Sequence, residues 1–173
     1  MTMSGRDFEQ VVVPHLDAAF NYARWLTKNE ADAEDVVQDA AIRALRFFGS
    51  LRSEDARAWL LSIVRNTWHG RAAAGSAHRT EVYDEMTDTR HAETLGPERL
   101  ALQQQTVAQV QRAVDTLPVD FREVIVLREI EGLSYKEIAA VVGVPVGTVM
   151  SRLSRARERL LAVLKPLVDG GCA

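Results

Sequence analysis

Cysteine is nearly absent from this sequence, since only 1 of its 173 residues is a cysteine. Aromatic residues make up only 6% of it. One cysteine excludes a disulfide framework within the chain and any metal site built from a cysteine cluster. The 4 histidines are too scattered for a local metal motif, so we expect no metal and no cofactor. Hydrophobic residues (47%) and charged residues (26%) nevertheless occur in the proportions of a globular protein.

Two other features are missing: a long apolar run and a strong charge of one sign. No run approaches the roughly 18 apolar residues of a membrane span, and residues 1–10 carry charged side chains in place of an apolar signal core. We therefore expect a soluble, cytoplasmic protein without membrane insertion. The net charge of -3 argues by itself against nucleic-acid binding, since such domains are usually strongly basic.

Enzymatic motifs are missing as well. No glycine-rich phosphate loop precedes a lysine, and no set of serine, histidine and aspartate has a recognisable local context. The sequence therefore predicts neither an enzyme nor a small-molecule substrate.

Helical periodicity runs through the first half of the chain, and no stretch shows the alternation of a strand. Pro14 precedes a first predicted helix. Asp32 with Asp35 resembles a capping box and predicts the start of a second helix, which ends before Gly49. Ser53 is expected to cap a third helix. The expected buried stripes are Ala33, Val37, Ala40, Ala44, Phe47 and Phe48 in the second helix, and Ala56, Trp59, Leu60, Ile63 and Val64 in the third.

The composition changes in the middle of the chain. Residues 71–97 are rich in small and polar side chains, and the few large apolar residues do not repeat. We interpret this segment as a linker between a first domain, residues 1–70, and a second, residues 98–173. It would reach roughly 90 Å fully extended and roughly 30 Å as a relaxed coil. The alternative is a surface loop of one domain, although structureless loops of this length are uncommon inside compact domains.

The second half returns to helical periodicity. One helix ends at Pro118, and a shorter one is closed by Gly132. A strict capping box from Ser134 to Glu137 starts a short helix, and Gly143 opens a tight turn before a long final helix. This is the layout of a helix-turn-helix, whose second helix enters the major groove of DNA. The predicted fold class is all-α, with two small helical domains joined by a flexible linker.

The final helix has two chemically different faces. Residues 146–165 carry five basic side chains and one acidic one, a local charge of +4, so the remaining residues sum to -7. Basic residues near a helix C-terminus also complement the helix dipole, an alternative that explains Arg159 and Lys165 better than the earlier arginines. The apolar stripe consists of Val149, Leu153, Ala156, Leu160 and Leu164, and the side chains that we assign to DNA binding are Thr148, Ser151, Arg152, Arg155 and Arg157.

Three motifs resemble those of a known family. The run from LPVDF to LLAVL, residues 117–164, is similar to region four of bacterial sigma-70 factors of the extracytoplasmic-function (ECF) type. In the first half, ADAEDVVQDAAIRAL resembles the helix of region two that binds core RNA polymerase, and AWLLSIVRNTWHGR resembles the segment that reads and melts promoter DNA. The three motifs follow one another in the order that this family shows.

The resemblance implies a function that periodicity does not. A sigma factor is a dissociable subunit that binds the clamp and flap of core RNA polymerase and directs the enzyme to promoter DNA. Region four would read the minus-thirty-five element as duplex, and region two would open the minus-ten element. The resemblance also implies an anti-sigma factor that holds the two domains closed and hides both the DNA-binding and the core-binding faces.

The core-binding face that the resemblance indicates lies on the second predicted helix. Its members recur at i, i+3, i+4 and i+7 and place one apolar side chain among acids, which suggests a partner surface. A solvated acidic face is the alternative. The residues are Asp35, Gln38, Asp39 and Ile42.

The minus-ten contacts that the resemblance indicates follow the buried stripe of the third predicted helix. Stacking of an unpaired base on an aromatic ring is worth about 1–3 kcal/mol. Few basic residues follow Trp68, which departs from the family pattern, and Asn66 is an alternative cap for the helix C-terminus. The candidate residues are Asn66, Trp68, His69 and Arg71.

Two other binding functions stay open on the sequence alone. A helix-turn-helix regulator that acts without core polymerase would leave the region-two resemblance unexplained. A sigma mimic that titrates an anti-sigma factor usually carries a signal-receiver domain, and the alternating strands and helices of such a domain are not seen here. Binding to core RNA polymerase separates the sigma factor from both alternatives.

Overall fold

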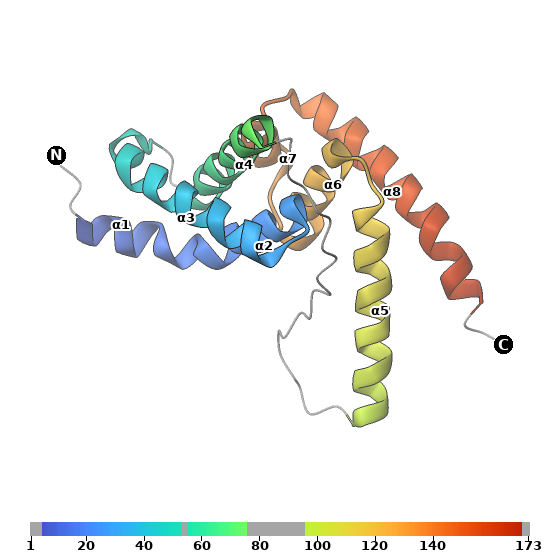
Figure 1. Ribbon diagram of the computed structural model, residues 1–173. Helices are drawn as coiled ribbons and strands as arrows, with labels where there is room; N and C mark the ends of the chain where they lie inside the picture. Colours follow the sequence, from blue (N-terminus) through green and yellow to red (C-terminus); the bar gives the residue numbers. More distant parts are fainter. Residues whose placement is uncertain (1–4, 53–54, 76–95, 171–173) are drawn as a thin grey trace.

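The computed structural model describes residues 5–52, 55–75 and 96–170. Over these ranges the chain forms helices and no strand, which confirms the all-α prediction. Helices α1 to α4 form an N-terminal bundle, and α5 to α8 form a C-terminal domain that packs against it (Figure 1). The long helices α5 and α8 diverge from the body of the molecule toward their free ends (Figure 1).

The N-terminal bundle is built on three helices that pack against one another. Helices α2, α3 and α4 contact each other pairwise, and α1 joins them through a short 3-10 turn. The elements are α1 (Gly5–Val11), η1 (Val13–His15), α2 (Leu16–Thr27), α3 (Glu30–Phe47), η2 (Phe48–Ser50) and α4 (Ala56–Ala74).

Two predicted helix starts in this bundle were wrong. The cap of α3 is Asn29, whose side chain accepts a hydrogen bond from the backbone N–H of Asp32 at 3.0 Å. Asp32 is therefore already inside the first turn, where its charge complements the helix dipole. The cap of α4 is Asp55, which accepts from the N–H of Ala58, while Ser53 lies outside the described residues.

The buried stripe of α3 also differs in two places from the prediction. Val36 is buried where Val37 was expected, although Val37 still packs against the core at its edge. Phe47 is 55% exposed, because the chain tightens into η2 after it and turns Phe48 inward. Phe48 meets the ring of Phe8 edge-on, with ring centroids 5.3 Å apart.

Helix α4 runs further than the domain boundary placed at residue 70. It continues through Ala74, and Gly75 closes it with an N–H that donates to the carbonyl of Arg71 at 2.8 Å. Three successive alanines, which have the highest helix propensity, explain the extension. Asn66 therefore lies inside the helix and does not cap it. Most of the remaining predicted linker, residues 76–95, lies outside the described residues.

The C-terminal domain contains the helix-turn-helix. Pro118 is the N-cap of α6, and α6 passes into a π-helical turn, where the N–H of Glu131 donates to the carbonyl of Val126. The elements are α5 (Pro97–Asp115), α6 (Val119–Ile125), η3 (Val126–Ile130), α7 (Tyr135–Val142) and α8 (Val146–Asp169).

The local signals predicted for the helix-turn-helix are confirmed. The N–H of Glu137 donates to Ser134 Oγ at 3.2 Å, and the N–H of Ser134 donates to Glu137 Oε2 at 2.6 Å. Gly143 ends α7 in the left-handed conformation (φ 72°), which costs glycine little. No single helix in the described ranges is long and apolar enough to cross a membrane, and α7 and α8 meet at 99°. Buried Val149, Leu153 and Ala156 attach α8 to the domain.

Replacing Ser134 with alanine is expected to lower the free energy of unfolding by about 1 kcal/mol, because the first turn of α7 loses the side chain that caps it. Urea unfolding followed by circular dichroism measures the difference. Ser154→Ala, at an exposed position inside α8, is the matched control and should change stability little. Equal stability of the two variants would show that the capping box contributes nothing measurable.

Candidate functional site

The N-terminal half of α8 presents the residues assigned to DNA binding on an exposed face. Ser151 and Arg155 are exposed and Thr148 is half-buried. Ser151 Oγ donates to the carbonyl of Thr148 at 3.0 Å, and a hydroxyl oxygen keeps two lone pairs that can accept from a ligand. This face suits the major groove of a duplex, which admits an α-helix.

The arginines of α8 differ in how they are held. Arg152 lies 3.6 Å from a carboxylate oxygen of Asp120, and Arg157 donates to Glu129 at 2.6 Å. The hydrogen bond to Glu129, the largest of several influences, raises the pKa of Arg157. Arg159 covers the ring of Phe121 at 4.9 Å. Among the described residues, Arg155 is the α8 arginine without an ion pair or ring contact, so its guanidinium is the one most available to a ligand.

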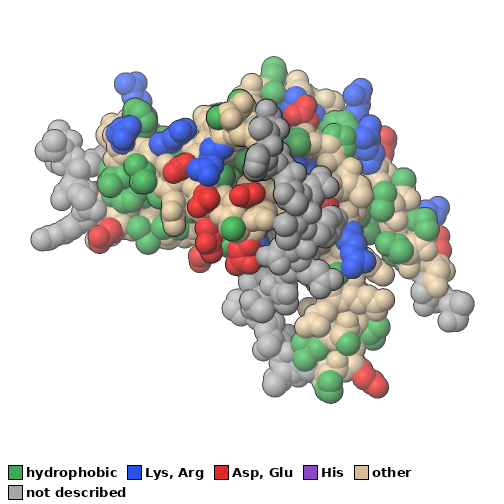
Figure 2. Space-filling view, in the orientation of Figure 1, with side chains coloured by type: hydrophobic (Ala, Val, Ile, Leu, Met, Phe, Trp, Pro, Cys, Tyr) green, Lys and Arg blue, Asp and Glu red, His purple; other side chains and the backbone are tan. Residues whose placement is uncertain are grey.

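The acidic face assigned to core binding lies on the outside of α3. Asp35, Gln38 and Ile42 are exposed, Ile42 to 59%, and Asp39 is half-buried. Acidic side chains gather over α2 and α3 in the space-filling view (Figure 2). Arg71 of α4 donates to Asp39 and lies 3.6 Å from Asp35. The structure thus brings one predicted minus-ten residue onto the predicted core-binding face.

The other predicted minus-ten residues do not share one surface. Asn66 is exposed on α4, whereas Trp68 is only 7% exposed. His69 is exposed, and its ring lies against that of Trp68 at 4.7 Å between centroids. In this arrangement the indole of Trp68 is packed inside the protein and has no face free for a base.

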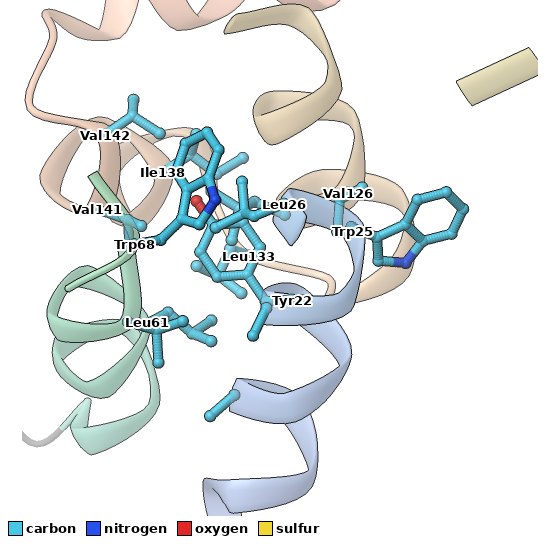
Figure 3. Close-up of a cluster of buried hydrophobic side chains, with 14 of the residues drawn as sticks. Tyr22, Trp25, Leu26, Leu61, Trp68, Val126, Leu133, Ile138, Val141 and Val142 are labelled. Atoms are coloured by element: carbon cyan, nitrogen blue, oxygen red, sulfur yellow. The ribbon is translucent and has the colours of Figure 1, made fainter. Parts of the chain in front are cut away.

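Trp68 is buried by the C-terminal domain. Figure 3 shows it together with Leu61 of α4, between α2 and α7. All of these residues belong to one continuous hydrophobic cluster that spans both halves of the chain. The side chains of α2 and α7 around them are Tyr22, Leu26, Ile138, Val141 and Val142 (Figure 3).

A buried carboxylate lies at this contact and was not identified from the sequence. Glu123 of α6 has no exposed surface, and its two oxygens accept from Arg65 Nε at 2.8 Å and Arg65 Nη2 at 3.2 Å. The hydroxyl of Tyr22 donates to the same carboxylate at 3.5 Å, and His69 Nε2 lies 3.7 Å away. The one available signal was an acid inside the apolar run of α6 and η3.

Other polar contacts join the two halves around this centre. Asn21 donates to Glu131 Oε1 at 2.8 Å, and Arg57 donates to the carbonyl of Glu131 at 2.9 Å. Lys28, which ends α2 in the left-handed conformation, donates to the carbonyl of Asp115 at 3.0 Å. We call this packing of α2 and α4 against α6 and α7 the closed arrangement.

A carboxyl pair also meets across the closed arrangement. Glu137, the acid of the α7 capping box, forms a hydrogen bond with Asp55, the cap of α4. This hydrogen bond lowers the pKa of Asp55, with help from backbone N–H groups and against the opposing effect of burial. Within the described residues, no cluster of three or more histidine, cysteine, aspartate or glutamate side chains could hold a metal ion.

Burial raises the pKa of the Tyr22 hydroxyl well above its ordinary value of about 10, and the negative charge of Glu123 adds to the shift. Since the folded protein resists ionisation of this group, stability is full below pH 10 and falls as the pH rises above it. Chemical unfolding between pH 8 and pH 11 measures the loss.

Tyr22→Phe is expected to flatten this alkaline loss, because no ionisable group remains at the buried position. Tyr135→Phe is the matched control, since it removes a hydroxyl from a half-buried tyrosine of α7 and should keep the wild-type slope. Equal slopes for all three proteins would contradict the assignment to Tyr22.

Comparison with known proteins identifies both halves. Residues 11–74 match the family model "Sigma-70 region 2", and residues 108–160 match "Sigma-70, region 4". The first range runs from the last residue of α1 to the end of α4, and the second runs from the second half of α5 through the helix-turn-helix into α8.

Curated and solved relatives agree with these matches. The chain is 36% identical over 153 residues to the ECF RNA polymerase sigma factor SigE of Mycolicibacterium smegmatis, covering 88% of this chain and 60% of the relative. It is 34% identical over 171 residues to the RNA polymerase sigma-H factor of Pseudomonas aeruginosa, covering 94% and 89%. The sigma factor RpoE of Bartonella quintana, solved in complex with the anti-sigma factor NepR, superposes with a TM-score of 0.73 at 29% identity, covering 92% and 98%. The chain therefore belongs to the ECF sigma factors of the sigma-70 family.

Proposed function

We propose that this chain binds core RNA polymerase through α3 and directs it to a set of promoters that α8 and α4 recognise. The observation that carries the proposal is that two separate helices, α8 and α3, expose side chains of different chemistry. One presents at the helix-turn-helix an arginine, Arg155, that has no ion pair among the described residues, and the other presents acids around an exposed isoleucine. The protein would act in the cytoplasm, where core polymerase works, without catalytic activity of its own.

Reading of the minus-thirty-five element is assigned to the first half of α8. Arg155 is free to make a bidentate contact with guanine, and Thr148 and Ser151 supply short hydroxyls for base edges or phosphates. Arg152 and Arg157 would reach DNA by exchanging Asp120 and Glu129 for phosphate, an exchange of one anion for another.

Core binding is assigned to the acidic face of α3. Asp35, Gln38 and Asp39 offer hydrogen-bond acceptors to a basic partner surface, and Ile42 offers apolar area that water does not favour. A basic partner helix would compete with Arg71 for the two aspartates, so core binding would release Arg71 toward promoter DNA.

Minus-ten recognition is assigned to α4. Asn66 and His69 are exposed and can meet a displaced base, while Trp68 becomes available only if α7 moves away from it. Region two would therefore engage the minus-ten element in an arrangement more open than the one observed.

An anti-sigma factor is the proposed regulatory partner. The similar RpoE of Bartonella quintana was solved with the anti-sigma factor NepR. The alternative, a helix-turn-helix regulator without core binding, gives no role to the exposed Ile42 among acids on α3. Reconstitution with core polymerase and run-off transcription on genomic fragments would test the proposal directly. A chain that neither binds core nor supports promoter-specific transcripts is not a sigma factor.

Arg155→Ala should lower promoter-specific transcription about fivefold or more, because one bidentate base contact is worth about 1–3 kcal/mol. Affinity for core polymerase should stay unchanged. Lys165→Ala is the matched control, since it also removes one positive charge from an exposed site of α8 but lies several turns beyond the reading face. Equal transcript yields from the two variants would remove Arg155 from the DNA interface.

Charge reversal at Asp35 and Asp39 (both to Lys) should weaken the complex with core polymerase by at least tenfold, because a basic partner surface would then meet like charge. Fluorescence titration of labelled sigma with core polymerase measures the affinity. Asp17→Lys with Glu30→Lys makes the same charge change at exposed sites outside this face and should matter much less. If both double variants bind core as tightly as the wild type, the face is merely solvated.

A further inference from the structure

The two halves of the chain pack against each other along an extended contact. The contact is continuous, since α4 packs along α7 and α2 touches α6 and η3. At its centre, the buried Glu123 of the C-terminal domain binds Arg65 of the bundle through both carboxylate oxygens. Arg65 itself is mostly covered, with 16% of its side chain exposed.

The closed arrangement hides one functional surface and leaves the others open. Trp68, on the proposed minus-ten helix, is 7% exposed because α7 covers it. By contrast, Ser151 and Arg155 on α8 are exposed, and so is most of the acidic face of α3. Closure therefore acts on minus-ten recognition and not on the other two proposed contacts.

The part of α4 at this contact has the chemistry of a nucleic-acid site. Arg65, Trp68 and His69 follow one another within about one turn of the helix and combine two groups that can carry positive charge with an aromatic ring. A cation beside a stacking ring is the combination that single-stranded nucleic acid favours. In the closed arrangement a carboxylate binds Arg65 where an oligonucleotide phosphate could bind.

We propose that the free chain is autoinhibited by Glu123, which binds Arg65 in place of promoter phosphate, and that Arg65 becomes a DNA contact when the halves separate. This inference rests on the proposed function, because it deepens the account of minus-ten recognition. It gives Arg65 two alternative anionic partners, one inside the chain and one on the promoter.

The ion pair between Glu123 and Arg65 can open and close again at little cost in free energy. Burying an ion pair carries a large desolvation penalty, which offsets most of the attraction between the two charges. The buried pair is therefore little more stable than the same two charges in water. Opening returns Glu123 to water and gives Arg65 a phosphate, so neither charge is left buried alone. Loss of one partner in the closed arrangement is different, because the remaining charge would then be buried without compensation. Neutralising Glu123 should therefore favour the open chain.

The test uses the full chain and two readouts. Small-angle X-ray scattering reports the separation of the halves, and fluorescence anisotropy reports binding to a labelled single-stranded oligonucleotide that carries a minus-ten non-template sequence. Glu123→Gln should increase the radius of gyration and tighten oligonucleotide binding at least fivefold, because a larger fraction of molecules is competent to bind.

Glu131→Gln is the matched control for charge. It removes one negative charge from the same contact but keeps an acceptor for Asn21, so both readouts should stay near the wild type. If Glu123→Gln stays as compact as the control, or opens without tighter binding, the autoinhibitory role is wrong.

Arg65→Gln tests the second half of the proposal, and its compactness alone tests the ion pair if Glu123→Gln does not fold. It should open the chain as well, but its open form should bind the oligonucleotide at least fivefold more weakly than Glu123→Gln. Equal binding by the two open variants would remove Arg65 from the DNA interface. A compact Arg65→Gln would refute the proposal that the Glu123–Arg65 ion pair is a latch that holds the two halves together.

Failure of the latch and failure of the sigma-factor function give different results. If Glu123→Gln opens the chain and binds the oligonucleotide tightly, but neither this variant nor the wild type binds core polymerase, the proposed function is wrong and the latch stands. If wild-type holoenzyme transcribes while both variants stay closed, the function stands and the latch is wrong.

Discussion

The burial of Glu123 is the constraint on which the rest of the structure depends. A carboxylate without solvent access must be paired, since an isolated buried charge is far too costly. The pairing cation, Arg65, comes from the other half of the chain, so the position of α6 fixes that of α4. Once Arg65 is paired with Glu123, the next turn of α4 carries Trp68 against α7, and the two halves close into one continuous hydrophobic cluster.

The closed arrangement changes how the domain organisation is understood. The two halves are distinct sequence units with separate family matches, yet they share a core in this structure. Polar groups are concentrated at the contact, where Asn21, Arg57 and Lys28 reach the C-terminal domain through hydrogen bonds. An interface with this many polar groups resembles transient interfaces more than a permanent core, which suits the proposed function, in which the halves reach two separate DNA elements.

Local chemistry explains which secondary-structure predictions succeeded. The capping box at Ser134 and the left-handed Gly143 involve neighbours within four residues, so their effects are visible in the sequence. The starts of α3 and α4 were misplaced because several polar residues lay within three positions of each other, and Asn29 and Asp55 were the ones whose backbone was extended or non-helical. The exposed Phe47 has a similar cause, since the 3-10 turn after it breaks the helical period.

The sequence by itself determined the helices, the helix-turn-helix and the faces of α3 and α8, because each depends on periodicity and caps within one element. Only the tertiary structure decided which charges are free. Arg152, Arg157 and Arg71 all pair with carboxylates that are distant in the sequence, whereas Arg155 pairs with none among the described residues. It also decided that Trp68 is covered and that Glu123 is paired. The physical reason is that ion pairs and burial depend on which helices meet, and no local pattern records that.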